Sequence, residues 1–464
     1  MLYYRGKYGI KTPPKNDSLT LDKKVTIQLP VFNEKYVVER LINTVCELDY
    51  PKENLEIQVL DDSTDETVDI LKRLVKQKRD EGFNIVSLHR DNREGFKAGA
   101  LSEGLKTAAG EFIAIFDADF IPRKDFLKET LSYFTSDKIG MVQTRWEHLN
   151  KDFSLLTKIQ AFALNAHFVI EQPVRNNAGF FINFNGTSGV IRKKCIEDAG
   201  GWQGDTITED LDLSYRAQLK EWKFIYLKDY TTPAELPIEM NSLRAQQFRW
   251  TKGAIETAKK LLLKVWKSKI SLRVKLQSTF HLTNNLVFPF ILLVGILNIP
   301  IILIKHTGEY DSLFNWMSIF ILAFISSYLL YYKAQEEDRQ NWFKRILFFP
   351  LFLAGSMGLS VNNTKAVFEG MFNFKSEFVR TPKYLSLALK ERKVWNEYLP
   401  KTAPLLLVTE FLFFLYSLLG VVLSVYLLNL TAFFFNLLFF IGFGIVSVLS
   451  LKESLFNKNI ISRK

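Results

Sequence analysis

Short apolar runs alternate with amphipathic stretches in the first part of the chain. The runs predict strands at 25–32, 55–60, 84–89 and 111–116. The stretches between them predict helices at 35–48, 65–80 and 95–108. Alternation of this kind is typical of an α/β fold built on a parallel sheet. Farther along, the pattern predicts a helical region at 153–177 and a basic amphipathic helix at 239–267.

Long apolar runs are concentrated in residues 279–451. Four of them reach the ~20 residues that a bilayer requires, at 280–304, 313–332, 404–428 and 431–450. A fifth segment, 346–361, has only 16 residues and contains Gly355, Ser356 and Gly358, so we interpret it as re-entrant or interfacial. Four spans place the N-terminal domain, the charged loops and the C-terminus on the same side of the membrane, in agreement with the positive-inside rule.

These patterns divide the chain into five parts. They are a basic N-terminal linker (1–24), an α/β domain (25–238), amphipathic interface helices (239–278), a membrane domain (279–451) and a basic cytoplasmic tail (452–464). Within the membrane domain, 362–400 is expected to be a cytoplasmic loop. The N-terminus lacks the apolar core of a secretory signal.

The composition narrows the choice of partners. A formal net charge of +11 suits the anionic face of a membrane or a phosphate-rich substrate. No pattern of a nucleic-acid-binding module is present, which argues against nucleic acid as a partner. The two cysteines, Cys46 and Cys195, have no CxxC spacing, so a disulfide scaffold and a structural zinc site are both unexpected.

Two acidic pairs follow predicted strands directly: Asp61 with Asp62, and Asp117 with Asp119. Ligands of such sheets bind outside the carboxyl ends of the strands, so both pairs are expected at one edge. Asp61 and Asp62 can accept hydrogen bonds from a nucleotide base or ribose. The alternative is a solvated turn in which Ser63 or a neighbouring aspartate caps the next helix.

The tripeptide Asp117-Ala-Asp119 is suited to a hard cation. Alternate residues at a strand end can direct two carboxylates to one point, where Mg²⁺ or Mn²⁺ would bridge them to a diphosphate. The tripeptide is common by chance, but its position after an apolar strand strengthens the interpretation. Lys97 neutralises phosphate or pairs with an aspartate in this scheme; a lysine on a helix surface is the equal alternative.

Two later motifs can carry chemistry. In Thr208-Glu-Asp210, one carboxylate could act as the general base on an acceptor hydroxyl, which suffices for an inverting displacement; the alternative is a helix start capped by Thr208. In QQFRW (246–250), Gln246, Arg249 and Trp250 share one helix face. Arginine can stabilise a diphosphate and tryptophan can stack on a sugar; the alternative is an interfacial helix anchored by tryptophan.

The ordered motifs resemble a known family. DDS, DAD, TED and QQFRW are similar to the D, DXD, TED, QxxRW series of processive family 2 glycosyltransferases, in particular the cellulose synthase-like mannan and glucan synthases. Longer stretches extend the resemblance over about residues 25–400, among them VQTRWEHLN (142–150), FNGTSGVIR (184–192), TEDLDLSYRAQLKEW (208–222) and EFVRTPK (377–383). It implies a GT-A-type, Rossmann-like α/β domain followed by an α-helical transmembrane domain.

The resemblance also assigns roles to residues. The nucleotide sugar would be bound by Asp61, Asp62, Lys97, Asp117, Asp119 and Arg249, with Mg²⁺ or Mn²⁺ held by Asp117 and Asp119. Asp210 would be the catalytic base. The acceptor would be bound by Asn185, Gly186, Thr187, Glu209, Gln246 and Trp250. EFVRTPK resembles the gating loop of cellulose synthases, although its Arg-Thr-Pro-Lys departs from the usual pattern, and its residues would be Phe378, Arg380, Thr381 and Lys383.

The function implied is an inverting, metal-dependent transfer of a hexose from UDP-glucose or GDP-mannose to a growing β-1,4-linked mannan or glucan. The polymer would be extruded across a plasma membrane, with the catalytic domain cytoplasmic; residue usage suggests a bacterial inner membrane. Accessory secretion subunits are a further partner that the resemblance allows. Two alternatives stay open: a non-processive enzyme that makes a glycolipid, and a catalytically dead membrane scaffold. Family members commonly carry a membrane helix before the catalytic domain, whereas this chain begins at the basic linker.

Overall fold

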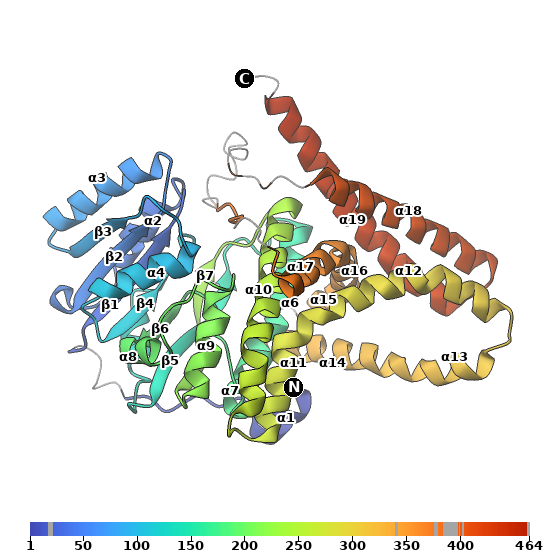
Figure 1. The fold of residues 1–464 in the computed structure, drawn as a ribbon, viewed down its shortest axis with the longest axis horizontal. Coiled ribbons are helices and arrows are strands. Elements are labelled where there is room, and N and C mark those ends of the chain that lie inside the picture. The colour runs from blue at the N-terminus through green and yellow to red at the C-terminus, as the bar shows by residue number, and fades with distance from the viewer. Residues whose placement is uncertain are drawn as a thin grey trace.

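The computed structural model describes residues 1–16, 22–338, 342–374, 379–383, 398, 400 and 403–461, with side chains up to residue 454. Three parts follow one another across the molecule (Figure 1). A sheet with helices on both faces lies at one end, the long helix α10 (Met240–Lys267) stands in the middle, and pairs of long apolar helices project from the other side.

Seven strands form one mixed sheet in the order β3-β2-β1-β4-β6-β5-β7. Strands β3, β2, β1 and β4 are parallel, β6 runs antiparallel to both neighbours, and β7 is parallel to β5. The strand bounds are Val25–Val31 (β1), Leu55–Asp61 (β2), Asn84–His89 (β3), Phe112–Ile115 (β4), Ile139–His148 (β5), Gly189–Arg192 (β6) and Lys223–Ala234 (β7). The four predicted strands are present, but the sheet is not wholly parallel as expected, because β6 returns between β4 and β5.

Helices cover both faces of the sheet, each over its own apolar core. One core contains residues of α2, α3 and α5, and the other contains residues of α4, α8 and α9. The bounds are Val38–Cys46 (α2), Thr67–Asp80 (α3), Phe96–Thr107 (α4), Phe126–Leu131 (α5), Lys193–Asp198 (α8) and Glu209–Leu219 (α9), with a short 3-10 helix at Lys52–Asn54 (η2). The region predicted helical at 153–177 is Leu155–Asn165 (α6), a π-helical turn at Ala166–Glu171 (η3) and Gln172–Asn177 (α7).

Close contact between α4 and the sheet sets the position of the first turn of α4. Alternation on β1 directs Gln28 toward α4, where its amide donates to Gln58 of β2 over 3.0 Å. A Cβ built on Gly104 of α4 would lie 2.6 Å from the Gln28 side-chain nitrogen, so only glycine allows this approach. The helix therefore lies directly on the sheet, and its first turn, with Lys97, lies beside the carboxyl end of β4.

The C-terminal half is helical. Its bounds are Leu272–Thr283 (α11), Asn284–Leu286 (η4), Val287–His306 (α12), Asp311–Met317 (α13), Ser318–Phe320 (η5), Ile321–Glu337 (α14), Trp342–Arg345 (α15), Ile346–Phe348 (η6), Phe349–Gly358 (α16), Ser360–Phe372 (α17), Pro404–Tyr426 (α18) and Leu430–Ile461 (α19). In the part of the chain that the structure describes, four stretches are long and apolar enough to cross a membrane: Leu272–His306, Asp311–Glu337, Pro404–Tyr426 and Leu430–Ser454.

The segment between the second and third stretches is helical on both sides of a bend. Trp342–Gly358 and Ser360–Phe372 form two helical stretches bent by 50° against each other, as in a broken span or a re-entrant loop. The expected cytoplasmic loop at 362–400 therefore begins as helix α17. Packing explains the difference, because α17 buries Ala366, Val367 and Gly370 in the interior of the protein.

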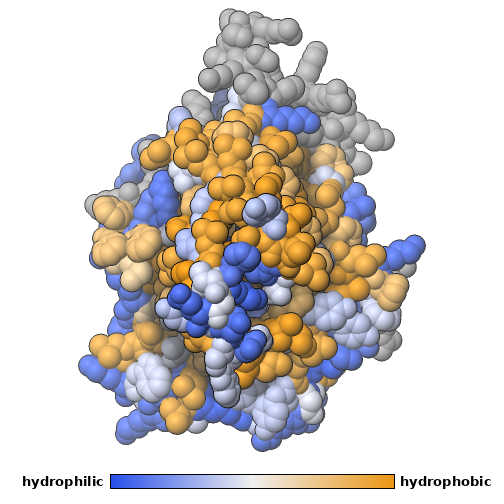
Figure 2. Space-filling view, turned by 90° about the vertical axis from the view of Figure 1, so that its right-hand side faces the viewer, coloured by the Kyte–Doolittle hydropathy of each residue, from blue (hydrophilic) through white to orange (hydrophobic). Residues whose placement is uncertain are grey.

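The surface of the projecting helices is apolar. Figure 2 shows a face dominated by hydrophobic side chains, interrupted by a polar patch. Trp316, Phe320, Leu405 and Leu428 are among the large apolar side chains that are well exposed there in the absence of a bilayer. Patches of this extent are unstable in water and indicate contact with membrane lipid.

The N-terminal segment was expected to be a linker, but it contains a short helix at Leu2–Tyr8 (α1). Tyr4 packs edge-on against Phe180, with ring centroids 4.8 Å apart. Arg5 donates to Glu337 at the end of α14 over 2.6 Å. Both contacts hold the helix against the folded body.

Candidate active site

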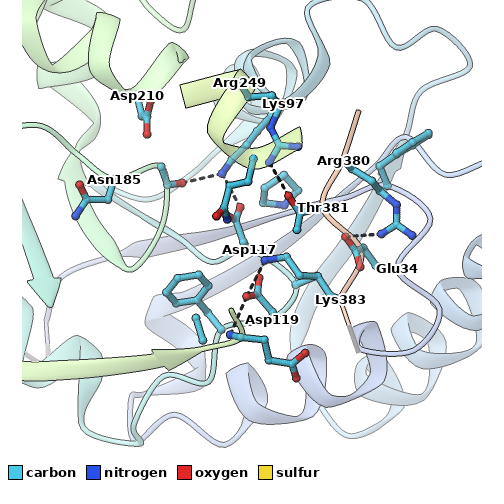
Figure 3. A pocket seen from close by; sticks show the side chains of 18 of the residues that line it. Glu34, Lys97, Asp117, Asp119, Asn185, Asp210, Arg249, Arg380, Thr381 and Lys383 are labelled. Carbon is cyan, nitrogen blue, oxygen red and sulfur yellow. Dashed lines mark hydrogen bonds and ion pairs between the residues drawn. The ribbon is translucent and has the colours of Figure 1, made fainter. Parts of the chain in front are cut away.

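A cavity of about 230 Å³ lies at the carboxyl ends of the strands, beside α10. It is bordered by the chain after β1, β2 and β4, by the start of α9 and by the segment 379–383 (Figure 3). The structure brings most of the predicted site residues to this one cavity. They are Asp62, Lys97, Asp117, Asp119, Asn185, Gly186, Glu209, Asp210, Gln246, Arg249, Trp250, Arg380, Thr381 and Lys383.

Of the first acidic pair, Asp61 and Asp62, only the second lines the cavity. Asp61 does not line the cavity: its carboxylate is 2.8 Å from the His89 ring and accepts the Ser63 amide over 2.9 Å. Asp62 does line the cavity, but Arg90 donates to both of its oxygens, over 2.7 and 2.5 Å. Asp61 thus stabilises the turn after β2, which is close to the alternative interpretation of this motif.

The two carboxylates of the second pair each contact a lysine. Lys97 donates to Asp117 over 2.5 Å, and Lys383 lies 2.9 Å from Asp119 (Figure 3). Asp119 is 1% exposed, and the backbone amide of Glu235 donates to the same oxygen, Oδ2, over 3.1 Å. The acidic end of β4 is therefore balanced by two ammonium groups.

This pair fits a divalent cation. The second oxygen of Asp119, Oδ1, is buried and has no hydrogen-bond partner within the described ranges, although a buried carboxylate oxygen normally has one. Within the same ranges, no group of three or more acidic, histidine or cysteine side chains forms a complete cation cage. Mg²⁺ and Mn²⁺ are commonly bound by one or two carboxylates together with phosphate oxygens of the substrate, which this arrangement allows.

Asp210 lies at the start of α9, across the cavity from β4 (Figure 3). Burial raises the pKa of its carboxyl above the ordinary value, and the positive charge of Lys97 opposes this rise. Burial and then the charge of Asp210 raise the pKa of its neighbour Glu209. An aspartate with a raised pKa is a stronger base than one in water, which suits the removal of a proton from a hydroxyl.

The loop 184–187 approaches Asp210 closely. Gly186 has a φ of +80°, and a Cβ built on it would lie 3.0 Å from Asp210 Oδ2. Its carbonyl oxygen accepts a hydrogen bond from Lys97 over 2.9 Å. Thr187 lies behind the cavity, where its hydroxyl accepts the Asp117 amide over 2.9 Å. Gly186 therefore keeps space beside Asp210, and Thr187 supports the acidic tripeptide.

Asn185 lines the cavity and has an unused hydrogen-bond donor. Its backbone amide donates to Gln143, and its side-chain oxygen accepts from Asn183 over 2.7 Å and from Gln172 over 3.2 Å. Its side-chain nitrogen is buried without a hydrogen-bond partner among the described residues. An amide held in this way can donate to a ligand oxygen.

The segment 379–383 lies across the cavity and is tied down at several points. Arg249 of α10 donates to the Val379 carbonyl and, over 2.9 Å, to the Thr381 hydroxyl. Arg380 lies 2.8 Å from Glu34, whose pKa burial raises to about 7 against the opposing charge of Arg380. With the contact of Lys383, the segment joins α10, the end of β1 and the acidic tripeptide. Phe378, the remaining predicted member of this loop, lies outside the described residues.

Several lining residues carried no prediction. Glu34 and Phe32 follow β1, and the Arg93 guanidinium lies 3.4 Å from the centre of the Phe32 ring. Position at or just after the end of a predicted strand was the available signal for Phe32 and Glu34. His148 also lines the cavity, and burial lowers its pKa to about 4, so it is neutral.

The family relationship agrees with this geometry. The sequence model of the family described as Glycosyltransferase like family 2 matches residues 23–253, which include both acidic pairs, Asp210 and the Q-x-x-R-W face of α10. The chain carries a family 2 glycosyltransferase domain. The expected resemblance and the GT-A-like fold of this glycosyltransferase domain are thereby confirmed.

Two plant proteins are similar in sequence. The chain is 41% identical over 266 residues to glucomannan 4-β-mannosyltransferase 1 of Oryza sativa subsp. japonica, covering 56% of this chain and 50% of the relative. It is 41% identical over 275 residues to the probable glucomannan 4-β-mannosyltransferase 4 of the same plant, covering 58% and 50%. The chain thus spans about half the length of the curated relatives it matches.

One solved structure supports the fold. The mannosyltransferase PcManGT of Pyrobaculum calidifontis, in complex with GDP-Man and Mn²⁺, has a TM-score of 0.55 and is 18% identical. The similarity covers 81% of this chain and 95% of that protein. At this level of identity it bears on the fold of the glycosyltransferase domain.

Proposed function

We propose that the protein is an inverting, metal-dependent membrane hexosyltransferase that extends a β-1,4-linked polysaccharide. The observation that carries this proposal is the shared cavity. A cation-binding pair of carboxylates, a buried aspartate base and the Gln246, Arg249 and Trp250 face of α10 line the same small space. These are the groups needed to hold a nucleotide sugar and to activate an acceptor hydroxyl beside it.

In the proposed reaction, Asp210 takes the proton of an acceptor hydroxyl. The hydroxyl oxygen forms a bond to the anomeric carbon, and the bond from that carbon to the diphosphate breaks on the opposite side, so the configuration inverts. The nucleoside diphosphate leaves with the bonding electrons. Asp117 and Asp119 would hold a divalent cation, which would supply positive charge to the diphosphate. Lys97 and Arg249 add positive charge at the same place, which favours the departing anion.

The acceptor is proposed to lie between Asp210 and α10. Trp250 offers a flat apolar surface for a sugar ring, and Gln246 and Asn185 offer amide groups for its hydroxyls. The raised pKa of Glu209 allows its carboxyl to accept or to donate a hydrogen bond near neutral pH. Asp62 is proposed to act on the nucleoside through Arg90, with Asp61 holding the turn from behind.

GDP-mannose is the donor that the relatives favour over UDP-glucose. The similar rice proteins are described as glucomannan 4-β-mannosyltransferases, and the structural neighbour contains GDP-Man and Mn²⁺. The product is then a β-1,4-linked mannan or a mannan that contains glucose. The four apolar stretches beside the catalytic domain support extrusion of this polymer through a membrane. We place the protein in a bacterial plasma membrane with its catalytic domain in the cytoplasm.

The test is polymer synthesis by the full chain in isolated membranes. Labelled GDP-mannose and UDP-glucose are supplied separately with Mn²⁺ or Mg²⁺, and the insoluble and lipid fractions are counted. Asp210→Asn should abolish incorporation of label and leave donor binding largely intact. Asp229→Asn, which changes an exposed surface carboxylate, should retain incorporation. Asp119→Ala should weaken donor binding in a metal-dependent way.

Each result has a consequence. Insoluble polymer from GDP-mannose, absent in Asp210→Asn and digested by a β-mannanase, supports the proposal. Label confined to the lipid fraction would identify a glycolipid-forming enzyme instead. Near-normal rates in Asp210→Asn would refute the role of that residue as the base.

A further inference from the structure

The first turn of α10 is held by carboxylates of the last two apolar helices. Glu453 of α19 accepts the backbone amides of Met240 and Asn241, over 2.7 and 3.0 Å. Glu410 of α18 forms an ion pair with Arg244, one turn farther along α10. Helix α10 therefore begins against two side chains that come from the other end of the sequence.

These contacts compensate groups of α10 that would otherwise lack a partner. The first amides of a helix have no partner within it, and the helix dipole favours a negative charge there, so Glu453 satisfies both requirements. Arg244 is 2% exposed and Glu410 is 0% exposed. Two guanidinium nitrogens of Arg244, Nε and Nη1, have no hydrogen-bond partner in the described part of the chain. Because a buried charge that loses its partner is strongly unfavourable, α10 is held where Arg244 meets Glu410.

Helix α17 holds α10 on both sides of the Q-x-x-R-W face. Asn362 donates to the Arg244 carbonyl over 3.3 Å, before Gln246 in the sequence. After Trp250, the fully buried Lys252 donates to Glu369 of α17 over 3.4 Å and to the Phe374 carbonyl, just beyond the end of α17, over 2.6 Å. The two helices are in direct contact, since a Cβ on Gly370 would lie 3.0 Å from the Lys252 carbonyl oxygen.

The active-site face of α10 lies between these contacts. Arg244 and Arg249 are five residues apart, a rise of about 7.5 Å along the helix. A helix of this length moves as a rigid body over such a distance, so a shift of its first turn displaces Arg249 and Trp250 within the cavity.

We propose that Glu410 and Glu453 are positioning residues for sugar transfer. Through them, α18 and α19 hold α10 so that Gln246, Arg249 and Trp250 face Asp210 and the acidic tripeptide. This inference rests on the proposed function, and it gives the C-terminal helix pair a part in catalysis in addition to its place in the membrane.

The test uses full-length variants purified in detergent, with rates expressed per amount of monodisperse protein. The variants are Glu410→Gln, Arg244→Met, the double variant of both, and Glu453→Ala. Asp338→Asn is the matched control, because Asp338 accepts from Arg145 of the sheet domain over 3.2 Å and does not contact α10. Three quantities are measured: kcat for transfer, the Kd of GDP with Mn²⁺, and hydrogen exchange of amides 240–250.

Each single variant at Glu410, Arg244 or Glu453 should lower kcat at least tenfold and speed exchange of amides 240–250 at least tenfold. The Kd of GDP with Mn²⁺ should rise as well, because Arg249, which faces the diphosphate in the proposed function, moves with the helix. The double variant should recover a kcat within about threefold of the wild type, since neither charge is then left unpaired. Asp338→Asn should change kcat and exchange less than threefold.

Three results would overturn the proposal. The first is a wild-type kcat in the single variants. The second is a double variant whose kcat is reduced by the product of the two single reductions. The third is a reduction of kcat in Asp338→Asn as large as in the single variants. If Arg244→Met does not fold, Glu453→Ala alone decides, through kcat and exchange together. A wild-type protein without transferase activity would refute the proposed function, whereas the exchange of amides 240–250 would still report whether the carboxylates hold α10.

Discussion

Replacement of Lys383 by methionine should tighten binding of a divalent cation. The Lys383 ammonium lies 2.9 Å from Asp119 Oδ2, and Asp119 is 1% exposed, so a cation bound by Asp119 competes with this contact. A hydrogen bond to a charged group contributes about 1.5–3 kcal/mol. Removal of the competitor should therefore lower the Kd of Mn²⁺ by about 10- to 100-fold, since about 1.4 kcal/mol corresponds to a factor of ten.

The assay is a titration of the purified protein with Mn²⁺ in the absence of nucleotide, with free Mn²⁺ followed by electron paramagnetic resonance. Arg380→Met is the matched control: it frees the same segment from Glu34, over a contact of 2.8 Å, without touching Asp119. Its Kd should stay within about twofold of the wild type. An unchanged or weaker Kd in Lys383→Met would refute the competition. Equal tightening in both variants would attribute the effect to the segment as a whole.

Three further predictions concern the base, its neighbour and the core. Gly186→Ala should lower kcat at least tenfold, because its Cβ would lie 3.0 Å from Asp210 Oδ2. It should also lower the melting temperature, because a φ of +80° is strained for a residue with a Cβ. A normal kcat would contradict the close approach. The rate should fall as pH is lowered through the pKa of Asp210, which burial raises, so kcat/KM should decline at a higher pH than for an ordinary aspartate; a flat profile down to pH ~4, near the ordinary aspartate pKa, would argue against this base. Leu261→Ala should cost about 2–5 kcal/mol of stability because Leu261 is 0% exposed, whereas Leu263→Ala, at 62% exposure, should cost less than about 0.5 kcal/mol, as thermal unfolding in detergent would measure.

The strands that the sequence predicted share one physical property. β1 to β4 are short runs dominated by apolar residues, so the hydrophobic pattern identifies them, although β1 and β2 also bury Gln28 and Gln58. β5 to β7 were not predicted, and β5 likewise includes polar residues at buried positions. Gln143 and Thr144 on β5 are 0% exposed, yet Gln143 donates to the Thr187 and Ser188 carbonyls, over 3.1 Å each, and so its burial is compensated. Such compensation depends on residues distant in sequence and leaves no local pattern.

The candidate site was predictable to a similar extent. Motifs that end a strand or begin a helix, such as the acidic tripeptide after β4 and Asp210 at the start of α9, could be located because the element fixes where the side chain points. The partners of these groups could not. That Lys383 contacts Asp119 and Arg380 contacts Glu34 depends on a segment more than two hundred residues away in the chain. For Asp61 the sequence located the residue but not its role, because it does not distinguish a carboxylate that faces a ligand from one that stabilises the turn.

Helix α10 makes the catalytic and the membrane parts depend on each other. The two cores of the sheet, within the described residues, contain no side chain beyond Ala234, so the sheet is stabilised without α10. The cavity, by contrast, is completed by α10, whose Leu261 packs with Tyr215 of α9, the helix that carries the proposed base Asp210. Helix α10 is held in turn by α17, α18 and α19. The geometry around Asp210 therefore depends on the sheet domain and on the C-terminal helices together. A fold that needed the membrane only as an anchor would not require carboxylates of α18 and α19 against the helix that lines this cavity.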